Sequence, residues 1–262
     1  MQSQKEMFLG FRKDRTIAAL VPAKQEAKFI YEVVRRSLPY VDKVLVVDDG
    51  STDQTVSEAI RAGAEVFRHP VSLGKGRALQ SGLKHLSGYA HVIMLDGDLQ
   101  HVPEEIERFV DEIALNDAAM IIGTRSFDKK TMPLLRRFTN SLMSNVISLL
   151  CGQRIADTQC GFRSVRSDVI EVLLGACRTV GYDFESEMLL LASRLGFRIR
   201  TVPVTTCYGL EVSKIRPLRD TIRFILLVLR YLVPQPHRTG GYSTVDFEEL
   251  NYPSKVHPES DV

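Results

Sequence analysis

Apolar residues gather along the chain in short runs that alternate with longer amphipathic stretches. Runs rich in valine, isoleucine and leucine, closed by proline, glycine or aspartate, predict buried strands. They occupy residues 16–21, 43–47, 64–68, 91–95, 118–123 and 198–204. Between them, apolar residues at helical spacing predict helices. These occupy residues 27–37, 52–63, 76–87, 103–116, 134–150, 169–174, 186–195 and 219–233.

This alternation of strands and helices with short connections predicts an α/β fold, a parallel sheet covered on both faces. Ligands of such sheets bind at the carboxyl ends of the strands. Pro22, Asp48, Asp49, Asp96 and Asp98 each follow or end a predicted strand. We therefore expect all five on one edge of the sheet.

Composition narrows the class of protein. The chain has 262 residues and a net charge of +2, which gives little support for nucleic acid binding. Its four cysteines are widely spaced and form no CxxC, so a structural zinc site is not expected. The N-terminus has no apolar core of signal-peptide length, and no window approaches about 18 apolar residues. We expect a cytoplasmic protein without a transmembrane helix.

The segment Asp96-Gly97-Asp98 carries the clearest candidate chemistry. Carboxylate oxygens are hard ligands, and Mg²⁺ or Mn²⁺ bridging a diphosphate needs one or two of them. Gln100 adds a neutral oxygen nearby. The alternative is an ordinary strand-end turn with solvated acids, but Asp48 and Asp49 on the same edge favour a site.

Two further motifs have both structural and functional interpretations. VVDDGSTDQT (46–55) is a turn with Ser51 or Thr52 as helix cap, or a carboxylate site for a base or ribose. GKG (74–76) opens a helix, where backbone N–H groups attract phosphate. It is not a P-loop, because Arg77 stands where that motif has serine or threonine.

Taken together, the motifs resemble the family 2 glycosyltransferases, in order and over about residues 16–230. They are VPAKQEA (21–27), VVDDGSTDQT (46–55), LGKGRAL (73–79), DGDLQHVPEE (96–105), GTR (123–125), DTQCGFR (157–163) and YDFESEM (182–188). DGDLQHVPEE, GTR and the RR…S at 136–141 are most similar to the dolichol-phosphate mannose synthase branch. The resemblance implies a GT-A nucleotide-diphospho-sugar transferase fold with a mostly parallel central sheet.

The chain departs from the family pattern at two places. The family usually has Tyr-Asn-Glu where this chain has Lys24, Gln25 and Glu26, and alanine where it has Gly97. The stretch YGLEVSKIRPLRD (208–220) is closer to bacterial relatives. The sugar and the choice between GDP and UDP therefore stay open, as does the polyprenol length.

The resemblance also implies roles for single residues. The nucleotide-binding set is Pro22, Ala23, Glu26, Asp48, Asp49, Lys75 and Asp96. The divalent ion, Mg²⁺ or Mn²⁺, would be held by Asp96, Asp98 and Gln100 and would stabilise the departing nucleoside diphosphate. Asp96, Asp98 and Asp157 form the catalytic set, with Asp157 supporting the acceptor.

For the acceptor phosphate, the resemblance implies Arg125, Arg137 and Ser141, with Arg136 as the alternative to Arg137. Arginine suits phosphate because its planar donors bind bidentately. Ser213 and Lys214 would lie on a loop over the diphosphate.

We predict four segments: an N-terminal extension (1–15), the catalytic domain (16–215), an amphipathic membrane-interface helix (216–233) and a polar tail (234–262). Basic residues beside the apolar 224–233 favour contact with a membrane surface, on its cytoplasmic face. The alternative for this helix and for 134–150 is packing on the sheet or a dimer interface. A homo-oligomer or a membrane-protein partner stays open.

The function expected is transfer of a hexose of the mannose or glucose type from a GDP- or UDP-sugar to a polyprenyl or dolichyl phosphate. The expected reaction is a metal-dependent inverting displacement. The first alternative is a family 2 transferase with a soluble or polysaccharide acceptor. The second is a non-catalytic nucleotide-sugar-binding membrane scaffold, which Lys24 and Gln25 favour and the intact acids oppose.

Overall fold

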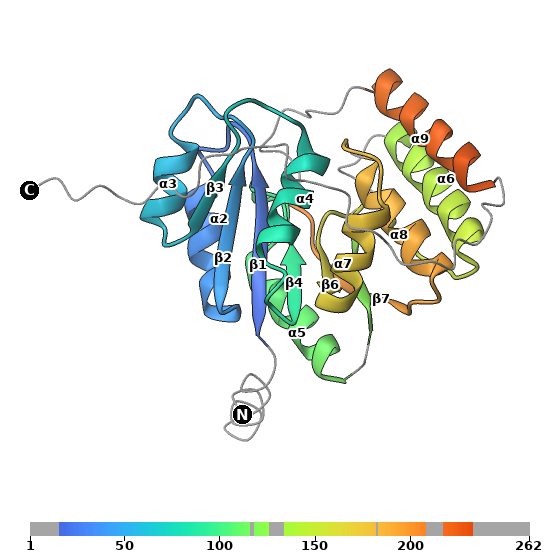
Figure 1. Ribbon diagram of the computed structural model, residues 1–262, viewed down its shortest axis with the longest axis horizontal. Helices are drawn as coiled ribbons and strands as arrows, with labels where there is room; N and C mark the ends of the chain where they lie inside the picture. Colours follow the sequence, from blue (N-terminus) through green and yellow to red (C-terminus); the bar gives the residue numbers. More distant parts are fainter. Residues whose placement is uncertain (1–15, 116–117, 126–133, 182, 208–216, 233–262) are drawn as a thin grey trace, which may run out of the picture.

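The computed structural model describes residues 16–115, 118–125, 134–181, 183–207 and 217–232, with the main chain alone for 134–138 and 217–220. Within these residues the strands form one seven-stranded sheet in the order β3-β2-β1-β4-β6-β5-β7 (Figure 1). The strands are β1 (Ile17–Ala23), β2 (Lys43–Asp48), β3 (Glu65–Arg68), β4 (His91–Met94), β5 (Met120–Arg125), β6 (Arg163–Arg166) and β7 (Ile199–Val204).

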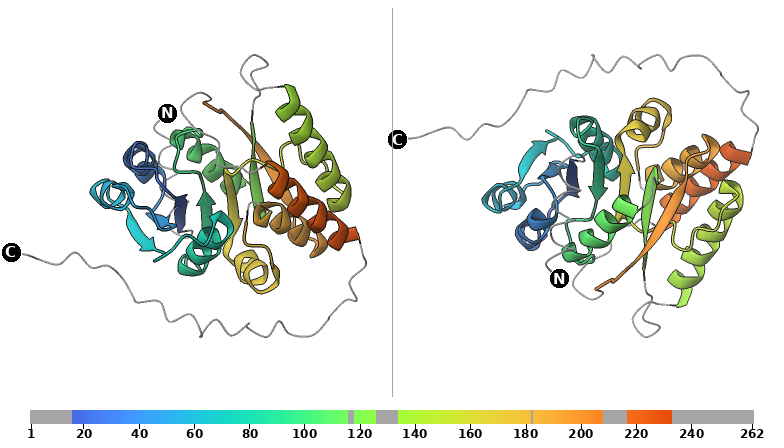
Figure 2. Two further views of the ribbon diagram at one scale, coloured as in Figure 1. Left: turned by 90° about the horizontal axis from the view of Figure 1, so that it is seen from above. Right: turned by 90° about the horizontal axis from the view of Figure 1, so that it is seen from below.

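Helices cover the sheet on both faces, as predicted. They are α2 (Ile30–Ser37), α3 (Thr55–Arg61), α4 (Lys75–His85), α5 (Ile106–Leu115), α6 (Leu134–Cys151), α7 (Ser167–Ala176), α8 (Phe184–Arg194) and α9 (Pro217–Leu232), with the short 3₁₀ turns Leu38–Tyr40 and Pro103–Glu105. Views along the sheet show α4 and α7 against one face and α5 against the other (Figure 2). The sheet is thereby removed from water on both sides, as its continuous apolar strands require.

Strand β6 is the exception in an otherwise parallel sheet. It runs antiparallel to both neighbours and pairs Arg163 with Met94 of β4. It therefore begins at the edge where β4 ends, and the preceding residues 157–162 reach that edge. The sequence analysis did not predict this strand, because its four residues, RSVR, carry two arginines and no apolar alternation.

Close packing of α4 on β1 fixes the first turn of that helix. Ile17 through Val21 of β1 are fully buried. At Gly82 of α4, an added Cβ would lie 2.2 Å from Cδ1 of Leu20 and 3.0 Å from Cγ2 of Val47. Only a glycine permits this approach, so the helix lies directly on the sheet and its N-terminal residue, Lys75, lies at the carboxyl edge of the strands.

Helices α6 and α9 lie side by side at the end of the molecule remote from α3 (Figures 1 and 2). Phe224, Leu227 and Tyr231 form the buried face of α9. The ion pair between Arg230 and Glu187 of α8, at 3.1 Å, anchors the helix. The opposite face remains apolar and half-exposed or more; it consists of Ile222, Ile225, Leu226, Leu229 and Leu232.

The predicted helix at 216–233 thus exists, with bounds of Pro217 and Leu232. The segments 1–15 and 234–262, predicted as extension and tail, lie outside the described residues. Among the described helices, none combines the length and the apolar character needed to cross a bilayer.

Candidate active site at the carboxyl edge of the sheet

The residues predicted at the carboxyl ends of the strands lie at one edge of the sheet. Ala23 ends β1 beside Asp48, which ends β2. Asp96 follows β4, and Arg125 ends β5. Because β6 is antiparallel, Asp157 is brought to the same edge, where it contacts Arg125.

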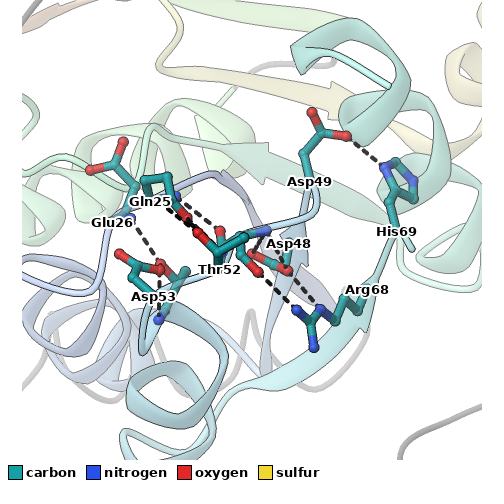
Figure 3. Close-up of polar contacts among 10 residues, drawn as sticks. Gln25, Glu26, Asp48, Asp49, Thr52, Asp53, Arg68 and His69 are labelled. Carbon is teal, nitrogen blue, oxygen red and sulfur yellow. Dashed lines mark hydrogen bonds and ion pairs between the residues drawn. The ribbon is translucent and has the colours of Figure 1, made fainter. Parts of the chain in front are cut away.

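Hydrogen bonds of Gln25 connect the end of β1 to the turn after β2 (Figure 3). Its backbone N–H donates to Oγ of Ser51 at 2.9 Å, and its side-chain Oε1 accepts from the N–H of Thr52 at 2.6 Å. Gln25 has a φ of 55°, in the left-handed region. Among the described residues, only Leu99 shares this feature outside glycine. Both lie in loops of the candidate site, where such strain is commonly found.

Asp48 is fully buried beneath this turn. Its carboxylate accepts from the N–H of Ser51, at 3.3 and 3.2 Å, and pairs with the guanidinium of Arg68 at 3.2 Å. Glu26, which is partly exposed, follows Gln25 after β1, and its N–H donates to Oγ1 of Thr55 at 2.8 Å. Figure 3 shows the Glu26 carboxylate pointing away from Thr52 and Asp48. Pro22, which is partly exposed, and Ala23 complete the predicted nucleoside set.

Asp49 accepts four hydrogen bonds from the segment that leads into α4. Its Oδ1 accepts from Nδ1 of His69 and the N–H of Leu73, both at 2.8 Å. Its Oδ2 accepts from Oγ of Ser72 at 2.7 Å and the N–H of Gly74 at 2.9 Å. Burial alone would raise the pKa of Asp49, but these donors outweigh it and hold the pKa well below its usual range. The geometry shows Asp49 positioning this segment; its predicted nucleoside contact stays a prediction.

A mostly buried cluster of charges lies next to this segment. Nζ of Lys75 is 2.8 Å from Oδ1 of Asp96 and 3.2 Å from Oε2 of Glu185, in the first turn of α8. Burial alone would lower the pKa of Lys75, but the two carboxylates outweigh it and raise that pKa. Lys75 in turn holds the pKa of Asp96 below its ordinary value, against the effect of burial. Both shifts favour the charged forms of Lys75 and Asp96.

The main chain packs closely at two glycines, one that contacts this cluster, Gly161, and one that follows Lys75 in the chain, Gly76. An added Cβ at Gly161 would lie 2.8 Å from Oδ2 of Asp96 and 3.3 Å from Nζ of Lys75. At Gly76, an added Cβ would lie 2.5 Å from the carbonyl carbon of Val180. Larger residues at these two positions would collide with the backbone or displace the charged groups.

Arg163 fixes the position of the loop before β6, which contains Gly161. It is fully buried, and it donates to the carbonyl oxygens of Cys160 at 2.8 Å, Thr158 at 3.0 Å and Glu185 at 2.6 Å. The loop before β6 and the first turn of α8 are thus fixed to each other.

Asp98 and Gln100 complete the acidic turn. Oδ1 of Asp98 accepts from the N–H of Gln100 at 2.9 Å, in a turn that contains Leu99 with its φ of 59°. No cluster of three or more histidine, cysteine or acidic side chains that could hold a metal occurs among the described residues. Two carboxylates in one turn nevertheless fit Mg²⁺ or Mn²⁺, which normally complete their shell with phosphate oxygens and water. The ammonium of Lys75 against Asp96 shows that a cation is accommodated there.

Arg125 and Asp157 form a buried bidentate pair. Nε of Arg125 donates to Oδ2 at 2.6 Å, and its second nitrogen donates to Oδ1 at 2.9 Å. The side chains are 9% and 1% exposed. The charges of Asp157 and Arg125 thus balance each other, and the two hydrogen bonds fix the orientation of the guanidinium.

The other residues predicted to bind the acceptor phosphate or the diphosphate are described in less detail. Ser141 lies on α6 with an exposed side chain. Arg136 and Arg137 lie in the first turns of α6, where the structure describes the main chain alone. Ser213 and Lys214 lie outside the described residues.

The sequence analysis missed three residues of this edge, Glu185, Arg163 and His101. Glu185 and Arg163 stand in the quoted motifs YDFESEM and DTQCGFR, but nothing in the sequence shows that they meet Lys75. His101 is buried beside the ring of Phe162, and burial lowers its pKa to about 4. Its Nδ1 has no hydrogen-bond partner among the described residues. Nothing in the sequence shows that His101 is buried, because its contact with Phe162 forms only in the fold.

Comparison with known proteins identifies the family. The family described as glycosyl transferase family 2 matches residues 18–174, which include the acidic turn and the Asp48–Asp49 edge. The chain belongs to glycosyl transferase family 2. As a member of this family it is a glycosyltransferase, and the predicted enzyme class is confirmed.

Two relatives match this transferase over most of its length. An uncharacterized protein of Methanocaldococcus jannaschii is 33% identical over 214 residues, covering 79% of this chain and 88% of its own. The UDP-N-acetylglucosamine–dolichyl-phosphate N-acetylglucosaminyltransferase of Methanococcus voltae is 28% identical over 234 residues, covering 80% and 93%. The predicted resemblance to transferases that use polyprenyl phosphates is confirmed.

A solved structure shares the fold of this transferase. Glucosyl-3-phosphoglycerate synthase of Mycobacterium tuberculosis, in complex with Mn²⁺ and UDP-glucose, has a TM-score of 0.68 at 22% identity, covering 88% of this chain and 84% of that one. The predicted GT-A fold is confirmed.

Proposed function

We propose that this transferase moves a hexose from a nucleotide-diphospho-sugar to a polyprenyl phosphate, with inversion at the anomeric carbon. The observation that carries the proposal is the arrangement of the acidic turn, Asp96 to Asp98, beside the Asp48 edge and the Arg125–Asp157 pair. A relative of similar length acts, by its name, on dolichyl phosphate.

The residues that would bind the nucleotide-sugar donor are better defined than those that would bind the acceptor. Pro22, Ala23 and Glu26 offer a surface for the nucleoside, over a turn that Asp48 and Gln25 hold rigid. Asp96, Asp98 and Gln100 would hold Mg²⁺ or Mn²⁺, which supplies Lewis-acid stabilisation of the leaving diphosphate. Lys75 adds a fixed positive charge beside them.

The acceptor half requires little base catalysis. A phosphate is already ionised at neutral pH, so positioning and electrostatic stabilisation carry most of the catalysis. Asp157, which is paired with Arg125, orients that guanidinium rather than removing a proton. Arg125 would position the lipid phosphate with Arg137 or Arg136 and Ser141, and Ser213 and Lys214 would close over the diphosphate.

The lipid chain needs an apolar surface, and α9 offers one. Its outer face of Ile222, Ile225, Leu226, Leu229 and Leu232 is exposed, and Leu142 and Leu149 of the neighbouring α6 are exposed as well. In this proposal these helices lie on the membrane, and the enzyme is peripheral on the cytoplasmic face. The segment 216–233 then acts as the interface helix of a catalytic domain at 16–215.

A transfer assay tests the proposal. Purified protein with Mn²⁺ would receive a polyprenyl phosphate and a panel of GDP- and UDP-sugars. We expect a glycolipid from one donor, no product with EDTA, and no product from a folded Asp98→Ala variant. Glu58→Gln, on α3, where the side chain is 24% exposed and pairs with Arg61, is the control for loss of one negative charge.

Two results would contradict the proposal in different ways. Donor hydrolysis or binding without a lipid product would reject the lipid acceptor and favour a soluble or polysaccharide one. Undiminished turnover by Asp98→Ala, or in EDTA, would reject the assignment of the acidic turn. Absence of both donor binding and turnover would favour a non-catalytic scaffold.

A further inference from the structure

Three charged groups from three separate parts of the chain meet in the mostly buried cluster beside the acidic turn. Lys75 begins α4, Asp96 follows β4, and Glu185 lies in the first turn of α8. Lys75 lies within 2.8 and 3.2 Å of the two carboxylates. One cation is therefore shared between two anions.

This sharing bears on how Asp96 binds a metal. Oδ1 of Asp96, a predicted ligand, is already held by the ammonium of Lys75. A divalent ion at Asp96 competes with that ammonium, because like charges at such distances repel strongly in a buried site. If Lys75 had no other counter-ion, its displacement would leave a buried charge unpaired, which is costly.

Glu185 is built to be that second counter-ion. Its carboxylate is close to the guanidinium of the fully buried Arg163, at 3.8 Å, and its main-chain carbonyl accepts from Arg163 at 2.6 Å. The residue is 8% exposed. Because Arg163 also fixes the loop before β6, Glu185 keeps its place when Lys75 moves.

We propose that Glu185 is a positioning residue that retains Lys75 as an exchangeable counter-ion of Asp96. Without a metal, Lys75 neutralises Asp96. When Asp96 engages a divalent ion, Lys75 stays paired with Glu185 and is free to face the diphosphate. Glu185 thereby raises the affinity of Asp96 for metal without touching the metal itself. The inference rests on the proposed metal site at Asp96 and Asp98.

Measurement of Mn²⁺ binding in a double-mutant cycle tests this role. The four proteins are the wild type, Glu185→Gln, Lys75→Met and the double variant, and bound Mn²⁺ is counted by electron paramagnetic resonance with no donor present. We expect Glu185→Gln to weaken Mn²⁺ binding about threefold or more when Lys75 is present, and much less when it is methionine. Lys75→Met alone should tighten Mn²⁺ binding, since no ammonium competes.

Equal weakening by Glu185→Gln in both backgrounds would overturn the proposal, because Glu185 would then act on the ion directly. Unchanged binding in all four proteins would overturn it as well. If the wild type binds no Mn²⁺ even with UDP or GDP, the metal site of the proposed function fails together with this inference. Glu58→Gln controls for net charge. Lys75→Gln replaces Lys75→Met if circular dichroism shows that variant unfolded.

Discussion

Asp49 and Asp96 follow β2 and β4, the strands on either side of β1, but serve the site in different ways. Asp49 accepts four hydrogen bonds, which come from His69, Ser72 and the main chain up to Gly74. Asp96 instead faces Lys75 across a partly exposed cluster. The first carboxylate shapes the approach to α4, and the second is available to a cation.

Asp49→Asn should lower the free energy of unfolding by about 1–3 kcal/mol at pH 7, because it removes charge from several buried hydrogen bonds. The native pKa of Asp49 lies below its ordinary value of 3.8. Its contribution is therefore fully present above the unfolded-state pKa and is lost as the pH falls through it towards the native pKa. Denaturant unfolding of both proteins between pH 7 and pH 3 measures this.

The difference in stability between wild type and Asp49→Asn should shrink as the pH falls below the ordinary carboxyl pKa. A difference that stays constant down to pH 3 would show that the charge of Asp49 does not stabilise the fold. The cost at pH 7 would then come from geometry alone.

Arg125 allows stability and acceptor binding to be separated. Arg125→Met leaves Asp157 buried without its partner, which should destabilise the fold by about 3–5 kcal/mol. Replacing both residues, as Arg125→Met with Asp157→Leu, should recover much of that loss. Neither variant should recover the use of polyprenyl phosphate. Chemical unfolding together with KM for lipid and donor distinguishes the two effects.

In both Arg125 variants we expect KM for the lipid to rise more than KM for the donor. If the stabilised double variant regains normal lipid use, Arg125 does not bind the acceptor and its role is structural.

At the scale of elements, the loop before β6 limits the space around the acidic turn. Gly161→Ala would place a Cβ 2.8 Å from Oδ2 of Asp96, whereas at Gly97 the nearest atom, Cδ1 of Ile30, is 3.4 Å away, an ordinary contact. We expect Gly161→Ala to reduce turnover about tenfold or more with little change in Tm, since a small displacement of reacting groups is costly.

Gly97→Ala is the matched control and should keep near-normal activity. The family usually has alanine at that position, and the structure has room for it. A loss of activity in Gly97→Ala equal to that in Gly161→Ala would show that both glycines matter through backbone flexibility, not through space beside Asp96.

The extent of prediction from sequence differs between elements. Strands β1, β2 and β4 were predicted because each is a continuous apolar run buried on both faces. Strand β6 was not predicted because two of its four residues, Arg163 and Arg166, are charged and do not suggest a buried strand. Arg163 can be buried only because it donates to a carbonyl oxygen distant in the chain, that of Glu185. Helix α2 begins at Ile30 rather than residue 27, because Gln25 and the residues after it form a turn.

The residues of the candidate site, like the strands, could be predicted only in part. Asp48, Asp49, Asp96 and Asp98 were placed on one edge because parallel strands align their carboxyl ends. The partners of those residues could not be predicted, since Lys75 meets Glu185 across 110 residues of sequence (185 − 75), where the first turns of α4 and α8 come together. Pairing of Arg125 with Asp157 likewise depends on the direction of β6.

For the whole molecule, the outer face of α9 sets where the protein meets the membrane in the proposed function. Leu226→Glu with Leu229→Glu places two charges on that face, where both side chains are more than half exposed. We expect binding to sedimented vesicles containing anionic lipid to fall about tenfold or more, with unchanged Tm, because charged side chains are costly in the apolar interface.

Leu115→Glu, on α5 and 78% exposed, is the control and should leave vesicle binding unchanged. If Leu226→Glu with Leu229→Glu binds vesicles normally but loses a dimer in sedimentation, the apolar face joins two copies of the chain and not a membrane.

Close packing at Gly76 and Gly161 limits the substitutions that this enzyme can accept at these two positions. Every amino acid carries the same main chain, so a surface formed by main chain offers natural selection little to vary by point mutation. New sugar preferences must therefore arise from side chains elsewhere around the edge, or from insertions that reshape a loop. Directed evolution of this transferase should accordingly leave 76 and 161 untouched and randomise exposed positions such as Lys24.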